Sequence, residues 1–192
     1  MTTANHQVPD LLFSNSTAAV NVNQEIQALS HAAPQLNQQV LKYALNAYNK
    51  ANHQGTVKKP LLTVIDFSLP SNRQRMWIFD LDKQQLLYNT YVAHGQNSGL
   101  DNAQHFSNNP DSKETSLGTY VTTDTYYGHH GLSLHIKGLE NGFNSNAYNR
   151  NVVVHGAWYV NADFIKKTGR AGRSWGCPAV GDKMATPIIN AI

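Results

Sequence analysis

The chain of 192 residues has one cysteine, Cys177, so it cannot form an intramolecular disulfide. No window approaches about eighteen uninterrupted apolar residues, and the start, MTTANHQVPD, has neither the basic nor the apolar region of a signal peptide. The 15 basic and 12 acidic side chains give a net charge of +3 without any Lys/Arg run. The sequence therefore indicates no membrane span, and neither nucleic acid nor a membrane surface as a partner.

Two segments precede the main domain. Residues 1–24 are rich in Asn, Thr, Ala and Gln without strong periodicity, which predicts a flexible polar arm. Residues 25–57 are predicted to be a helical segment, with Pro34 in the first turn of its second helix and its end near Gly55. The apolar positions of that helix fall on one face: Leu36, Val40, Ala44, Leu45 and Tyr48.

Residues 58–192 form the main predicted domain, in which short β-rich runs are bounded by Gly, Pro, Asn, Asp or Ser. The runs are 61–67, 76–81, 86–93, 118–123, 132–136 and 152–155. The second and third are predicted to form a hairpin through Asp82 and Lys83. Without a parallel βαβ repeat, this spacing predicts a mainly β fold, an antiparallel β-sandwich or open barrel with the N-terminal helices packed on it. The long polar connections 95–116 and 138–150 are expected to wall the functional site.

His155 and Cys177 carry the strongest chemical signal, and each is flanked by glycine. Three valines before His155 predict a buried strand, so the imidazole stands at a strand end, where Gly156 leaves room for a substrate backbone. Gly176 and Pro178 hold Cys177 on a constrained turn. An imidazole that takes the thiol proton raises the reactive thiolate fraction. Its other nitrogen needs an acceptor, and since no carboxylate stands nearby in the sequence, we expect a backbone carbonyl.

These segments resemble a known family. HGA (155–157) and GRSWGCPA (172–179) are similar to the His-Gly and Ser-x-Gly-Cys signature of murein L,D-transpeptidase catalytic domains, which have the YkuD-like fold. The similarity extends upstream to IDFSLPSNRQRMWIFDLD, VAHGQNSG, FSNNPDSKETSLGTY and GLSLHIKGLENGFNSNAYNR. It covers roughly residue 61 to the C-terminus.

The resemblance implies a cysteine-dependent acyltransferase that acts on peptidoglycan stem peptides. Cys177 is expected to attack the tetrapeptide carbonyl at the diamino acid, release D-alanine and form a thioester, which passes to an amine or to water. His155 is expected to be the general base and acid. Four further residues are expected to shape the pocket or to stabilise the oxyanion through backbone N–H groups: Gly156, Ser174, Trp175 and Gly176. Arg173 or, alternatively, Arg170 is expected to pair with a substrate carboxylate.

Two positions differ from the family pattern. Trp175 stands where many members have His, and Ala179 where many have Asn or Arg. The family's domain is also expected to continue into a last strand, which predicts that the C-terminus is truncated at Ile192. We expect no cofactor, no metal, a monomer, and export to the periplasm with the signal peptide outside this sequence.

Alternative functions use the same residues differently. An L,D-carboxypeptidase differs only in its acceptor, water. A catalytically silent peptidoglycan-binding module would keep an inert, buried thiol, whereas a depressed thiol pKa would favour an enzyme. The nine histidines, among them His94, His129, His130 and His135, suggest the alternative of a zinc peptidase, but no HExxH motif is present. His94 and His135 are instead expected to contact substrate. In papain-like peptidases the cysteine precedes the histidine, the reverse of this order.

Overall fold

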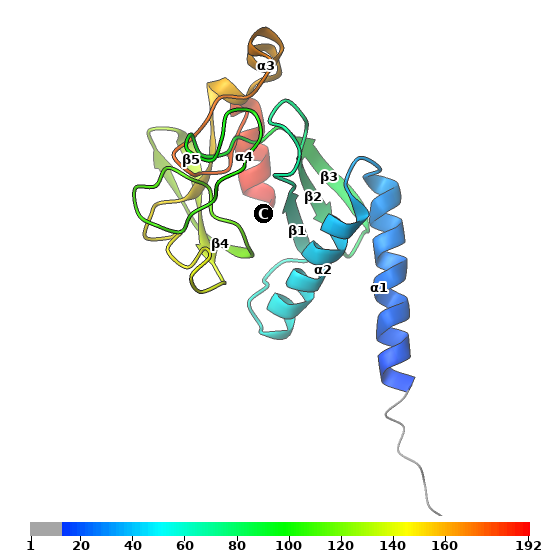
Figure 1. Cartoon of the computed structure of the whole chain (residues 1–192). Helices are drawn as coiled ribbons and strands as arrows, with labels where there is room; N and C mark the ends of the chain where they lie inside the picture. The colour runs from blue at the N-terminus through cyan, green and yellow to red at the C-terminus, as the bar shows by residue number, and fades with distance from the viewer. Residues whose placement is uncertain (1–12) are drawn as a thin grey trace, which may run out of the picture.

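The computed structural model describes residues 13–192, with side chains from residue 23 onward. This part of the chain contains two β-sheets and four α-helices (Figure 1). The helices are α1 (Phe13–Ala32), α2 (Gln38–His53), α3 (Ala162–Thr168) and α4 (Asp182–Ala191), with a short 3-10 helix η1 (Trp158–Val160). The strands are β1 (Leu61–Ile65), β2 (Met76–Asp80), β3 (Gln85–Thr90), β4 (Tyr120–Gly128), β5 (Gly131–Gly138), β6 (Val153–Gly156) and β7 (Ala179–Val180).

Helix α2 begins at an asparagine cap. The Asn37 side chain accepts hydrogen bonds from the backbone N–H groups of Gln39 (2.8 Å) and Val40 (3.4 Å), which satisfies donors that the first helical turn leaves free. Pro34 therefore lies in the turn between α1 and α2, and its predicted place in the first turn of the second helix was wrong. The predicted stop is confirmed, since Gly55 follows the helix with a left-handed φ of 69°.

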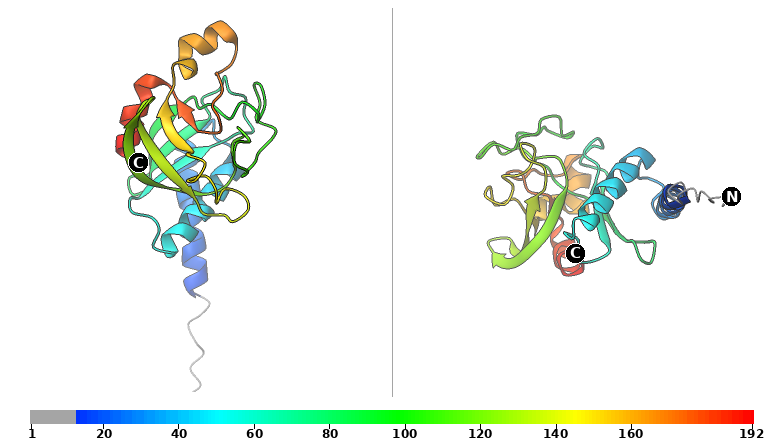
Figure 2. Two further views of the ribbon diagram at one scale, coloured as in Figure 1. Left: turned by 90° about the vertical axis from the view of Figure 1, so that its left-hand side faces the viewer. Right: turned by 90° about the horizontal axis from the view of Figure 1, so that it is seen from below.

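Helix α1 reaches further toward the N-terminus than predicted. It begins at Phe13, so the part of the expected polar arm from residue 13 to 24 is helical, and residues 1–12 lie outside the described residues. The helix projects away from the body of the molecule (Figure 2), while Leu29 and Ala33 near its other end are fully buried. It continues outward from this packed end, and hydrophobic periodicity does not predict such an extension. No helix within residues 13–192 is both long and apolar enough to cross a membrane.

Strand β2 is the centre of the first sheet, whose order is β1-β2-β3, and it is buried on both faces. Trp77 and Phe79 share a core with α1 and α2, whereas Met76 and Ile78 pack on the other face against α4 and the second sheet. Figure 1 shows α4 lying between the two sheets. The first sheet is therefore an inner layer, which explains its nearly continuous apolar sequence.

The second sheet, in the order β4-β5-β6-β7, contains a parallel pair that the sequence analysis missed. β4, β5 and β6 are antiparallel neighbours, but β7 runs parallel to β6, and η1 and α3 form the crossover between them. The expectation of no parallel βαβ unit was wrong because β7 has only two residues, Ala179 and Val180, too few for a period-2 pattern.

The predicted strands are confirmed as elements, with shifted ends. All six β-rich runs contain a strand, and β2 and β3 form the predicted hairpin. Two facing sheets agree with a YkuD-like fold, whereas the description "mainly β" is only loosely met, because α1, α2 and α4 pack against and between the sheets.

Replacing the cap of α2 tests its contribution to stability. We expect Asn37→Ala to lower the free energy of unfolding by about 1 kcal/mol, because two backbone N–H groups lose their acceptor. Urea denaturation followed by circular dichroism measures this change. Asn37→Asp keeps the acceptor and serves as the control; equal stability of the alanine variant and the wild type would contradict the assignment.

Candidate active site

The parallel strand pair brings the candidate nucleophile to its candidate base. His155 in β6 pairs with Ala179 in β7, which places Cys177, two residues earlier, beside β6. The Cys177 Sγ atom accepts a hydrogen bond from the Val153 backbone N–H (3.5 Å). Val153 and His155 are alternate residues of β6, roughly 7 Å apart along the strand, so the thiol is bonded to the same short strand that carries the imidazole.

His155 is held as a neutral imidazole in one tautomer. Its Nδ1–H donates to the Gly156 carbonyl oxygen (2.8 Å), and since a carbonyl only accepts, Nε2 carries the lone pair. The expectation of a backbone carbonyl partner is confirmed. The pKa of His155 is lowered, first by burial and then by nearby His130, against the opposing effects of the Gly156 carbonyl and Asp182. At neutral pH His155 is therefore an unprotonated base.

A second imidazole covers this base. His130, in the turn of the β4–β5 hairpin, stacks on His155 with ring centroids 4.3 Å apart and an interplanar angle of 26°. The hairpin is fixed there because Ser133 of β5 pairs with His155 of β6. His130 is exposed to solvent, so it separates the buried base from the surface.

The thiol of Cys177 rests in its protonated form. Its S–H donates to the Asn151 carbonyl (3.7 Å), and within residues 13–192 Sγ has no hydrogen bond to His155. Burial raises the pKa of the Cys177 thiol, against the lowering effects of the Val153 N–H and of Arg150. A pre-formed thiolate would require a lowered thiol pKa, so this shift is in the opposite direction.

Ser174 organises the turn that carries the thiol. Its buried Oγ donates to the Cys177 carbonyl (2.7 Å) and accepts from the Gly176 N–H (3.1 Å). Gly176 has a φ of 120°, and a Cβ there would lie 2.7 Å from the Glu114 carbonyl oxygen, so the turn requires glycine. The Gly176 N–H is already bonded, whereas the N–H groups of Trp175 and Cys177 have no acceptor in the described part of the chain.

The two long connections wall this turn, as predicted, and Arg150 joins them. Its Nη1 donates to the Ser107 carbonyl (2.8 Å), and its Nη2 to the Glu114 carbonyl (2.7 Å). The guanidinium is also close enough to lower the pKa of Cys177. Sequence reasoning missed Arg150, because an isolated loop arginine belongs to no motif and its Nη1 and Nη2 donors find their partners only in the folded chain.

Further contacts tie the first of these loops to the cysteine turn. Thr115 Oγ1 donates to the Gly176 carbonyl (3.3 Å) and accepts from the Gly95 N–H (3.0 Å). On the other side of the thiol, Asn151 adopts a left-handed φ of 54° that directs its carbonyl to Cys177. Such positive φ values are uncommon outside glycine and often occur at functional sites.

A buried Arg75–His94 pair lies behind the cysteine turn and is hydrogen-bonded to it through the His94 backbone. Arg75 Nη2 donates to His94 Nδ1 (2.7 Å), and His94 Nε2–H donates to the Gly99 carbonyl (3.3 Å). The His94 carbonyl accepts from the Ser174 N–H (2.9 Å), which links the pair to the cysteine turn. Both side chains have 0 % exposure, so the expected contact of His94 with substrate was wrong. Burial, and then Arg75, lowers the pKa of His94 to about 4.

The other described histidines are not grouped as metal ligands. Within residues 13–192, no three His, Cys, Asp or Glu side chains are grouped so that they could hold a metal ion. His135 binds Asp124 (2.8 Å) and stacks on Tyr126 with ring centroids 4.6 Å apart. These contacts occupy one His135 nitrogen and one ring face.

The remaining expected site residues occupy different positions. A Cβ on Gly156 would meet Asp182 (3.1 Å) and Ala185 (3.2 Å), so this glycine makes room for α4. Trp175 is 71 % exposed beside the thiol, with the Lys113 ammonium 4.8 Å from its ring centroid. Arg173 lies on the other side of the turn, where Nη1 donates to the Gln96 carbonyl (2.9 Å).

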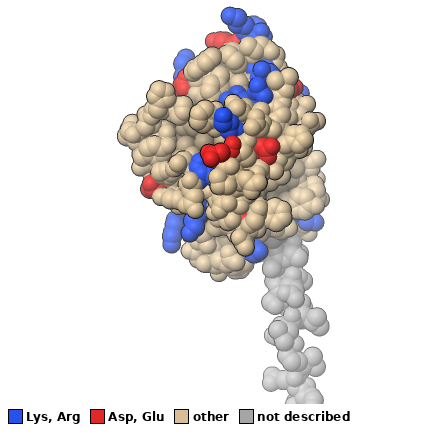
Figure 3. Space-filling view, turned by 60° about the vertical axis from the view of Figure 1, so that its left-hand side comes forward, with Lys and Arg blue, Asp and Glu red and all other residues tan. Residues whose placement is uncertain are grey.

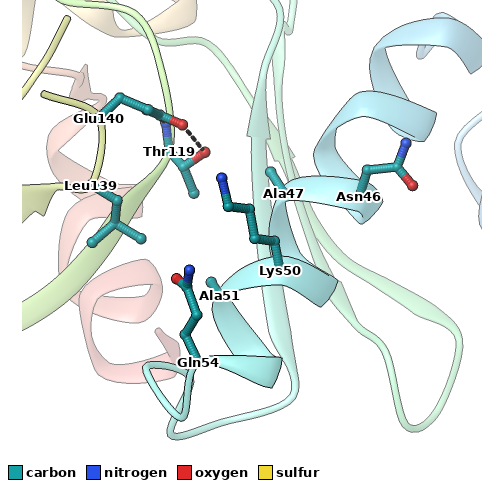
Figure 4. A pocket seen from close by; sticks show the side chains of 8 residues that line it. All are labelled: Asn46, Ala47, Lys50, Ala51, Gln54, Thr119, Leu139 and Glu140. Carbon is teal, nitrogen blue, oxygen red and sulfur yellow. Dashed lines mark hydrogen bonds between the residues drawn. The ribbon is translucent and has the colours of Figure 1, made fainter. Parts of the chain in front are cut away.

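A separate hollow lies between α2 and the end of β5 (Figure 4). Lys50 of α2 and Gln54, the residue after this helix, face Glu140, whose carboxylate accepts a hydrogen bond from Thr119 Oγ1 (2.7 Å). Glu140 follows the C-terminal end of β5, whereas Ser133, which pairs with His155, lies near the other end of this strand. The hollow contains no thiol or histidine and is distinct from the Cys177 site.

Comparison with known families identifies the family of this chain. The chain belongs to the family described as L,D-transpeptidase catalytic domain, whose model matches residues 32–192 and so includes α2. Proteins of this family act on peptidoglycan and are associated with the cell wall. No significant match was found to a curated protein or to a solved structure.

The buried His94 makes stability depend on pH. Its pKa of about 4 in the folded protein lies below the 6.5 of the unfolded chain, so the unfolded chain binds the proton first. The stabilisation is complete above pH 6.5 and is lost as the pH falls toward 4, by on the order of 3 kcal/mol. Urea unfolding between pH 7.5 and 4 measures it. His94→Gln cannot titrate and should show a shallower dependence; identical slopes would refute this role.

Proposed function

We propose that the protein is a peptidoglycan L,D-transpeptidase that uses Cys177 as nucleophile and His155 as general base. One observation carries the proposal: the only thiol in the chain is bonded to the backbone of β6, the strand whose His155 keeps its Nε2 lone pair free because Nδ1 is bonded to Gly156. This is the arrangement that an activated cysteine needs. The family to which the chain belongs supports the reaction class.

In the proposed reaction, substrate enters while the pair is neutral. The Cys177 S–H turns from the Asn151 carbonyl to His155 Nε2, which takes the proton as sulfur attacks the carbonyl carbon at the diamino acid. The tetrahedral intermediate collapses to a thioester, and the imidazolium protonates the amine of the departing D-alanine. An amine then attacks the thioester to form a cross-link, with His155 again taking and returning the proton.

The oxyanion requires hydrogen-bond donors that are not already bonded to an acceptor in the protein. The Cys177 and Trp175 N–H groups meet this condition, since neither has an acceptor within residues 13–192, and we assign them this role. Ser174 and Gly176 hold the turn in which these N–H groups lie. The exposed ring of Trp175 forms a wall for the stem peptide.

The raised thiol pKa favours a second candidate, a silent binding module, over an enzyme with a resting thiolate. In our proposal the thiol is activated only when His155 takes its proton during attack, so a raised resting pKa is compatible with turnover. An L,D-carboxypeptidase would use the same residues with water as acceptor. Because the substrate is cell-wall peptide, we place the protein in the periplasm.

Incubation with tetrapeptide-bearing muropeptides, followed by mass spectrometry, tests the reaction. We expect the wild type to release D-alanine and form a dimer, and Cys177→Ala to lose at least about a thousandfold in rate, because the nucleophile is removed. D-alanine release without dimers would identify the carboxypeptidase instead.

Binding of the same muropeptides is measured in parallel to separate enzyme from module. A protein that binds them with equal affinity before and after Cys177→Ala, and turns over none, would be the silent module and would disprove the proposed reaction.

His130 should tune the pH dependence of this reaction. Burial, and then His130, lowers the pKa of His155, and His130→Ala both exposes the base and removes a neighbouring charge. The pKa of His155 then rises, so the acidic limb of the kcat/KM profile moves to higher pH. The comparison is the pH–rate profile of wild type and variant.

His130→Phe is the matched control, since it keeps an aromatic ring over His155 but cannot be charged. We expect its profile to lie between those of the wild type and His130→Ala. A profile unchanged in both variants would show that His130 does not influence the base.

A further inference from the structure

A pocket lined by two arginines opens beside the cysteine turn. It measures about 270 Å³ and lies between η1, α3 and the segment before Ser174. Its aromatic wall is Trp158, which meets Phe164 edge to face with ring centroids 5.3 Å apart. Its polar residues include Arg170 and Arg173. Figure 3 shows basic side chains, in blue, on the face toward the end that carries α3.

Neither arginine is neutralised by the protein. Arg170 Nη1 donates to the Ala171 carbonyl (3.0 Å), and Arg173 Nη1 to the carbonyls of Gln96 (2.9 Å) and Gly99 (3.3 Å). No carboxylate within residues 13–192 forms a salt bridge with either side chain. Each keeps further N–H groups for a ligand, and guanidinium groups match carboxylates in bidentate geometry.

The pocket is continuous with the nucleophile turn. Arg173 immediately precedes Ser174, whose carbonyl accepts from the Gln96 N–H (2.8 Å) at the pocket's other side. Tyr159 packs against Gly172, where a Cβ would lie 2.5 Å from its ring. Burial, and then the neighbouring Cys177, raises the pKa of Tyr159 to about 12.

We infer that the pocket is a subsite for a carboxylate of the stem peptide, held by Arg170 and Arg173, with the attached aliphatic chain against Trp158 and Phe164. This inference rests on the proposed function for the identity of the peptide. The charge on the pocket is opposite to that of the group it binds, and its aromatic wall excludes water from one side of the ion pair. The subsite orients the peptide so that the carbonyl at the diamino acid reaches Cys177.

Calorimetric binding to Cys177→Ala protein tests the subsite without any need for turnover. The probes are a synthetic tetrapeptide with all its carboxylates and three derivatives, each with one group amidated: the C-terminus, the glutamate carboxylate or the diamino-acid carboxylate. We expect Arg170→Gln to weaken binding of the parent peptide about tenfold or more, since a charge-assisted bond is lost. Arg170→Gln should not weaken binding of the one derivative in which the carboxylate that contacts the two arginines is amidated.

Two further variants make the result decisive. Lys167→Gln, on the exposed surface of α3, removes the same charge outside the pocket and should leave affinity unchanged. Arg170→Lys keeps the positive charge but lacks the planar guanidinium needed for a bidentate contact, so it should recover part of the affinity. This variant replaces Arg170→Gln if the glutamine variant is unstable. The same loss for all four peptides, or no loss, would overturn the subsite. Absence of turnover in the wild type would refute the proposed function alone.

Discussion

The parallel pairing of β6 with β7 is the constraint on which the site depends. It sets Ala179 opposite His155 and so delivers Cys177 to the strand that carries the base. The Ala179 carbonyl also accepts from the Ala93 N–H (2.8 Å), and Gly95 forms a parallel bridge with Ser174. The cysteine turn is therefore held from both sides by backbone hydrogen bonds, which leave it little freedom to move relative to His155.

Burial determines the resting chemistry of the pair. Removal from water disfavours the charged form of each group, so it lowers the pKa of His155 and raises that of Cys177. The same environment strengthens hydrogen bonds to a developing oxyanion, because competing water is excluded. A neutral pair that becomes charged only as substrate reacts would also protect a lone thiol from oxidation, since oxidants react with the thiolate and not with the protonated thiol.

Sequence reasoning succeeded where the signal is local. Period-2 runs located six strands, and the lack of a nearby carboxylate correctly predicted a carbonyl partner for His155. It failed where contacts are distant along the chain. Arg150 gains a role through carbonyls about 40 residues away, and His94 lies buried because Arg75 binds it. Neither relation leaves a pattern in the sequence.

By itself, then, the sequence located six of the strands and marked His155 and Cys177 as the candidate pair, because hydrophobic period, turn residues and a lone thiol are local properties. Only the tertiary structure decided how these parts meet. The two-residue β7 exists because β6 and the Ala93 backbone bond to it, and Gly156 serves the packing of α4 because of where Asp182 lies. Protonation is decided at the same level, since burial and neighbouring charges arise only when the chain is folded.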